Sequence, residues 1–98
     1  MSAPTPLFPP GQVVATPGAI ARMEHHGVDA IDLLTRHVSG DWGDLCDEDT
    51  QANEEALCTG GRIFSAYGDG DARIWLITEA RDGTGTRCAT TYLTPEEY

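Results

Sequence analysis

The spacing of apolar residues changes from a helical period to a strand period near residue 60. In the earlier part, Thr16 and Pro17 are typical of a helix start and Gly27 of a helix end, which predicts a helix over PGAIARMEHH. Ile20 and Met23 of that helix are expected to face the core. The chain therefore opens with a short amphipathic helix.

Two further helices follow in the pattern. VDAIDLLTRHVSG begins with Asp29 as a cap, and its apolar positions recur at helical spacing: Ile31, Leu34 and Val38, with Leu33 widening the stripe. A third helix is predicted from about Asp47 to Thr59, because acids fill its first turn and Gly60 and Gly61 follow it. Its apolar face is small.

After residue 60, three segments alternate in polarity and are rich in β-branched and aromatic residues: RIFSAY, ARIWLIT and RCATTYLT. They are separated by GDGD and ARDGTGT, which predict hairpin turns. In the middle segment Trp75 and Ile77 face one way while Ile74 and Leu76 face the other, so this strand is expected to be central. The predicted fold class is α+β, with two or three short N-terminal helices packed on a three-stranded antiparallel β-meander.

The ends of the chain add little to this architecture. Residues 1–10 form a proline-rich segment, expected to be a tail or an edge-docking segment, and residues 11–98 form a single α+β domain. Val13 and Val14 are compatible either with a strand or with an entry into the first helix. No stretch approaches the length of a membrane span and no secretion signal is present, which predicts a cytoplasmic, soluble protein.

Charge narrows the possible partners. The 98 residues include sixteen acids and six arginines, for a net charge of −10. Direct binding to nucleic acid or to an anionic membrane is electrostatically opposed, so the expected partner is a basic protein surface. The guanidinium groups are expected to hold the fold together through hydrogen bonds. No cofactor is expected, and a homodimer is left open.

The most unusual stretch is SGDWGDLCDEDTQANEEAL, which holds seven carboxylates and no basic side chain. It departs from a calcium loop because Ala52 stands where the turn glycine is needed. It also lacks the contrasting environments that two catalytic carboxylates require. Two interpretations remain: a solvated helix face, or a partner-binding surface whose carboxylates, roughly 6 Å apart at one helical turn, resemble a phosphate backbone. The candidate partner-binding residues are Asp41, Trp42, Asp44, Asp47, Glu48, Asp49, Glu54 and Glu55, with Trp42 either an exposed anchor or a core residue.

Other candidate chemistry is weak. The spacing of His25, His26, His37 and Cys46 matches no compact zinc pattern, so no metal site is predicted. Ser65 lacks the Gly-x-Ser-x-Gly context of a nucleophile, and no catalytic residue is predicted. The three cysteines, which form no Cys-x-x-Cys pair, are expected to be reduced and half-buried: Cys46, Cys58 and Cys88.

Five stretches resemble a family of small bacterial proteins that recurs on plasmids, prophages and other mobile elements: GQVVATPGAI, RHVSGDWGDL, GGRIFSAY, IWLITEA and TTYLTPEEY. The similarity covers nearly the whole chain. The family is loosely described as plasmid-related or restriction-associated, and it supplies no catalytic residues. Glu79, Ala80 and Arg81 keep its acid-then-arginine feature, while DGTGTR lengthens the hairpin. Mobile elements also carry small acidic anti-CRISPR and anti-restriction inhibitors, an analogy of charge and size.

The sequence thus predicts a non-enzymatic, acidic inhibitor or regulator that binds a basic protein surface, such as that of a nucleic-acid-binding defence effector. One alternative is a small toxin-like ribonuclease that uses Arg73, Arg81 and Arg87 near the hairpins. It would need a positive face to hold RNA. The other alternative is an accessory subunit of a larger assembly whose acidic face only keeps it in solution.

Overall fold

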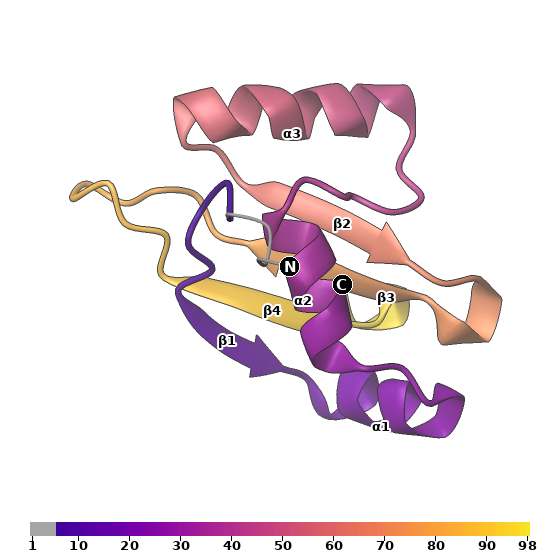
Figure 1. The fold of residues 1–98 in the computed structure, drawn as a ribbon. Coiled ribbons are helices and arrows are strands. Elements are labelled where there is room, and N and C mark those ends of the chain that lie inside the picture. The colour runs from indigo at the N-terminus through magenta and orange to yellow at the C-terminus, as the bar shows by residue number, and fades with distance from the viewer. Residues whose placement is uncertain (1–5) are drawn as a thin grey trace, which may run out of the picture.

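The computed structural model describes residues 6–98, and in them three helices and four strands form an α+β fold (Figure 1). The elements follow one another as β1 Gln12–Ala15, α1 Pro17–His26, α2 Ala30–Val38, α3 Asp47–Thr59, β2 Ile63–Tyr67, β3 Ile74–Thr78 and β4 Ala89–Leu93. Two short 3-10 turns, Gly70–Ala72 and Pro95–Glu97, lie between β2 and β3 and after β4.

Helices α1 and α2 begin at the caps expected from the sequence, and α1 and α3 end at the expected glycines. The Thr16 side chain accepts a hydrogen bond from the Ala19 N–H at 3.1 Å, and Asp29 accepts one from the Ile31 N–H at 2.9 Å. Gly27 ends α1 with φ at 65°, in the left-handed region that glycine adopts without steric cost. The predicted bounds of α1 and α3 are confirmed.

The sheet differs from the predicted antiparallel meander. It has four strands in the order β1-β4-β3-β2, and β1 runs parallel to β4, with Gln12 paired to Ala89 and Ala15 to Tyr92. The prediction of three antiparallel strands was therefore wrong, and so was the placement of all helices before the sheet. The β2-β3-β4 part is antiparallel with β3 in the interior, as expected.

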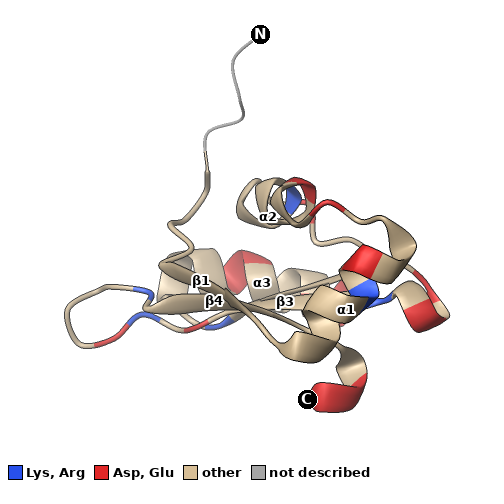
Figure 2. Cartoon of the chain, turned by 90° about the horizontal axis from the view of Figure 1, so that it is seen from below, with Lys and Arg blue, Asp and Glu red and all other residues tan. Residues whose placement is uncertain are grey.

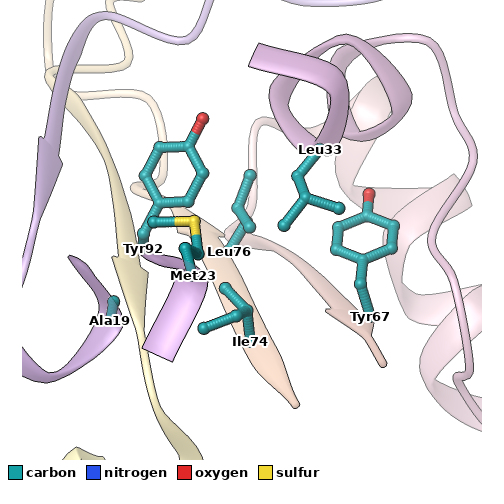
Figure 3. Packing of buried hydrophobic residues seen from close by; sticks show 7 residues of the cluster. All are labelled: Ala19, Met23, Leu33, Tyr67, Ile74, Leu76 and Tyr92. Atoms are coloured by element: carbon teal, nitrogen blue, oxygen red, sulfur yellow. The ribbon is translucent and has the colours of Figure 1, made fainter. Parts of the chain in front are cut away.

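The core lies between the sheet and helices α1 and α2. Figure 3 shows its seven buried residues, which are Ala19, Met23, Leu33, Tyr67, Ile74, Leu76 and Tyr92. Ile20 and Ile31, both predicted to face the core, are 45% and 67% exposed. Met23 faces the core as predicted, and Ala19, four residues before it, is the second core residue of α1. In α2 the residue in this core is Leu33.

Helix α3 occupies a different position from the other two helices. It lies alongside the outer edge of β2 (Figure 1) and packs on β2 through Asn53 and Ala56. Ala56 joins a second buried cluster with Phe8, Val38, Trp42 and Ile63. The side of α3 away from the sheet is exposed.

The proline-rich segment is partly described. Residues 1–5 lie outside the described part, so the predicted tail is described only from residue 6 onwards. Phe8 is 4% exposed, and the Leu7 N–H donates to the Val38 carbonyl at 2.7 Å. This part of the segment packs against α2 and the sheet.

Candidate functional site

The acidic run forms one exposed surface on α3. At roughly 3.6 residues per turn, Asp47, Glu48, Glu54 and Glu55 fall on the side of the helix opposite to Asn53 and Ala56. All four are exposed, and Figure 2 colours the acidic residues of the chain red. We call these four residues the acidic face of α3. None of the ion pairs found in residues 6–98 includes any of them.

The carboxylates of the acidic face are spaced differently from the prediction. No two acids of α3 are three or four residues apart, so none are neighbours at one helical turn. Instead the pair Asp47 and Glu48 and the pair Glu54 and Glu55 lie two turns apart, about 11 Å along the axis. Gln51 lies between the pairs. Asp49 is also exposed but points away from this face.

The other predicted partner-binding residues are engaged within the fold. Asp41 accepts from the Arg36 guanidinium at 2.8 Å, and this hydrogen bond lowers the pKa of the Asp41 carboxyl. Asp44 lies 3.7 Å from the Arg73 guanidinium. Trp42 is 5% exposed and is a core residue, one of the two alternatives left open by the sequence. Its indole N–H donates to Glu54 at 3.3 Å, which links the core to the acidic face.

The arginines do not form a common basic surface. Arg87 is 2% exposed and donates to three backbone carbonyls, while Arg81 donates to the Leu57 carbonyl at 3.1 Å. Arg73 lies at the other end of β3, beside Asp44 and Asp69. The positive face that an RNA-cleaving toxin would need is therefore not assembled from these three residues.

A chain of buried hydroxyl groups surrounds His37, a feature that the sequence analysis missed. The His37 ring contacts Ser65 through Nδ1 at 2.5 Å and Thr78 through Nε2 at 2.8 Å. Thr78 contacts Thr90 at 2.6 Å, and Thr90 donates to the Pro10 carbonyl at 2.7 Å. All four side chains are fully buried, and they join α2 to strands β2, β3 and β4.

The Pro10 carbonyl fixes the direction of the hydrogen bonds between itself and His37. A carbonyl only accepts, so Thr90 donates to it and accepts from Thr78. Thr78 has then used its only proton, so it accepts from Nε2–H of His37. Burial lowers the pKa of His37 to about 4, so the ring is neutral at pH 7. In the neutral ring Nδ1 carries no proton, and it accepts from Ser65.

The pairing of Ser65 with His37 has the composition of a base-activated nucleophile but not its accessibility. Both side chains are 0% exposed, so a substrate has no route to the Ser65 hydroxyl. The neighbours of the ring are aromatic, with Phe8 at 5.3 Å and Trp42 at 6.0 Å between ring centroids. The arrangement is that of a satisfied polar network inside a core.

A second surface lies on the face of the sheet away from α1 and α2. A cavity of about 260 Å³ lies there, lined by Phe64, Trp75, Ile77, Arg62 and Tyr98. Figure 2 shows that α2 and the C-terminal turn lie on opposite sides of the sheet. The Trp75 ring contacts Phe64 and Tyr98 edge-on, and Arg62 donates to the Tyr98 hydroxyl at 3.0 Å. A cavity with these walls suits a ligand that carries an apolar group beside an anionic group. The sequence pattern that could have predicted this surface is that of β3, which is apolar on both of its sides.

Other site types receive no support from the described residues. Within residues 6–98, no three His, Cys, Asp or Glu side chains come together as a metal site. The three cysteines are free and exposed, so the expectation that they are half-buried was wrong: they lie at helix and strand ends instead of on inward positions. In this part of the chain, no helix has the length and apolarity needed to cross a membrane.

Comparison of the chain with family models, with curated proteins and with solved structures finds no match.

Proposed function

We propose that the protein is a non-enzymatic binding protein that recognises a basic surface of a partner protein through the acidic face of α3. The observation that carries this proposal is the contrast within the acidic run. Asp41 and Asp44 each pair with an arginine of the same chain, whereas the four carboxylates of the acidic face take part in no ion pair within residues 6–98. A surface left with uncompensated charge attracts a partner of opposite charge and accelerates its association.

The rigidity of α3 also supports the proposal. Asn53 fixes the helix to the edge of β2, and the indole of Trp42 holds one Glu54 oxygen from the core side. Side chains presented from a fixed helix lose less entropy on binding than those on a mobile loop. The two carboxylate pairs fit two clusters of arginine or lysine about 11 Å apart. A protein groove that holds DNA or RNA is one surface with such clusters.

The proposal is tested by affinity capture from a bacterial lysate at low and at raised salt, with three forms of the protein. We expect the wild-type chain to retain a nucleic-acid-binding protein whose retention falls steeply with salt. The variant D47N/E48Q/E54Q/E55Q should lose it. In that variant, the Gln side-chain oxygen at position 54 can still accept from Trp42, so folding should be nearly unchanged.

The matched control is E24Q/D32N/D69N/D71N, which removes the same number of charges from exposed acids outside α3. We expect this control to retain the partner. Equal loss of the partner from both variants would show that net charge alone explains its capture. Retention of the partner by the α3 variant would contradict the proposal. The recovered protein is then purified, and its DNA or RNA binding is measured with and without the wild-type chain.

A further inference from the structure

The two edges of the sheet differ in how their outward-pointing backbone groups are bonded, and within residues 6–98 the β1 edge has no further partner strand. The Gln12 N–H donates to the Cys88 carbonyl and the Thr16 N–H donates to the Tyr92 carbonyl, both at 3.0 Å, so these groups face β4. Backbone groups alternate in direction along a strand, and those of Val13 and Ala15 therefore point outward. In residues 6–98, β1 pairs with no strand other than β4.

The β2 edge, in contrast, is fully occupied. The Asn53 side chain bonds to both the N–H and the carbonyl of Phe64. Further along, the Ala66 N–H donates to the Trp42 carbonyl at 3.1 Å and the Ala66 carbonyl accepts from the Asp44 N–H at 2.8 Å. Proteins that leave an edge unpaired usually protect it with charge, proline or a covering segment. The QVVA sequence of β1 has neither charge nor proline, and Val13 and Val14 are 42% and 39% exposed.

We infer that β1 pairs with β1 of a second copy of the chain, antiparallel and around a two-fold axis beside Val14, which joins two four-stranded sheets into one of eight strands. In this register Val13 of each copy lies opposite Ala15 of the other, and both pairs exchange two N–H···O bonds. The two Val14 residues face one another as a close, non-hydrogen-bonded pair. This inference is independent of the function proposed for α3.

The surface beside β1 suits the side chains that this pairing brings. The register with β4 places Val13 and Ala15 on the same face of the sheet as Tyr92, toward the helices. An apolar groove of about 280 Å³ runs beside Ala15, lined by Ile20, Met23, Val28 and Tyr92 among others. Val13 of the second copy, opposite Ala15, enters this groove. The pairing thus covers Ile20, whose exposure the monomer leaves unexplained.

The distribution of charge favours a second copy over a charged partner at this edge. β1 carries no charged residue, whereas α3, with five acids and no base, lies at the opposite edge of the sheet. In the paired sheet the two α3 helices lie at the two far ends, with β2 and its counterpart separated by seven strand spacings, roughly 34 Å. That exceeds the screening length of about 8 Å at physiological salt. The two most acidic segments therefore repel one another little.

The first test is sedimentation analysis of the wild-type chain over a range of concentrations. We expect a concentration-dependent species with twice the 10.5 kDa mass of one chain. Val13→Pro removes the outward N–H, a substitution that an edge strand tolerates, and should give a monomer. The matched control Val13→Thr keeps the N–H and the branched shape and should remain dimeric. Val14→Lys brings two ammonium groups together at the axis and should also give a monomer.

Amide hydrogen exchange gives a second readout within the wild-type chain. The Val13 and Ala15 amides should exchange slowly in the dimer and faster on dilution, while Gln12, bonded to Cys88 in either state, serves as the internal reference. The near-ultraviolet circular dichroism of the buried Trp42 reports whether each variant is folded. A wild-type chain that sediments as a monomer at every concentration would overturn the inference. So would a dimer that persists in both Val13→Pro and Val14→Lys. Raised salt should strengthen this dimer but weaken partner binding through α3, so the two proposals fail separately.

Discussion

The side-chain amide of Asn53 makes with Phe64 the two hydrogen bonds that a neighbouring strand would otherwise make. Its nitrogen donates to the Phe64 carbonyl at 2.6 Å, and its oxygen accepts from the Phe64 N–H at 3.0 Å. Asn53 is 3% exposed. One polar residue on the inner side of α3 thus occupies the Phe64 part of the β2 edge, beside the Trp42–Asp44 segment at Ala66, and sets the position from which the acidic face projects.

We expect Asn53→Ala to lower the free energy of unfolding by about 2–4 kcal/mol, because the partly buried N–H and carbonyl of Phe64 both lose their partner. Urea denaturation followed by circular dichroism measures the change. Gln51→Ala, on the exposed side of the same helix, is the control and should change stability by at most about 0.5 kcal/mol. Equal effects at the two positions would show that the Asn53 hydrogen bonds contribute no stability.

The parts of the fold that could be predicted from the sequence are those determined by residues close together in the chain. The caps at Thr16 and Asp29 and the alternation in β2, β3 and β4 each depend on residues close together in sequence. The pairing of β1 could not be predicted in the same way, because its partner β4 lies at the other end of the chain. A four-residue strand has too short a pattern to reveal a parallel partner.

The candidate site was predictable only in part for the same reason. The acids of α3 belong to a helix whose bounds the sequence indicates, so their exposure follows from helical geometry. Asp41, Trp42 and Asp44 belong to a loop, and only the tertiary fold decides that Arg36 and Arg73 reach the two carboxylates. The His37 network joins side chains from four elements, and no spacing in the sequence indicates it.

The stability of the protein should fall as pH decreases from about 6.5 to 4.5, because of His37. Its pKa is about 4 in the folded chain and near 6.5 when unfolded. Below pH 6.5 the unfolded chain binds the proton more readily, so protonation favours unfolding. Between pH 7 and pH 4, the loss of stability from His37 amounts to about 3 kcal/mol. The carboxyls of Asp41 and Glu97 have lowered pKa values, so their protonation reduces the stability of the fold only at lower pH.

Denaturant titrations at a series of pH values measure this slope. His37→Gln should lower stability at pH 7 and flatten the slope between pH 4.5 and 6.5, because no group then titrates at this position. The exposed His25 provides the control, and His25→Gln should leave the slope unchanged. A slope that survives His37→Gln would assign the acid sensitivity to another group.

Arg87 should be the arginine whose replacement costs most stability. Its guanidinium donates to the carbonyls of Gly61 at 2.6 Å and of Glu79 and Ala56 at 3.0 Å. These carbonyls belong to the end of α3, the loop before β2 and the end of β3, so one planar group joins three segments. We expect Arg87→Met to lower the free energy of unfolding by about 2–4 kcal/mol.

Arg87→Lys should cost nearly as much as Arg87→Met, because an ammonium group keeps the charge but lacks the planar fork that reaches three carbonyls. The comparison separates hydrogen-bond geometry from charge. Arg81→Lys is the matched control, since Arg81 is exposed and donates to a single carbonyl, that of Leu57. It should change stability by less than about 1 kcal/mol. If Arg87→Lys were as stable as the wild-type chain in the same urea titration, charge alone would account for the role of Arg87.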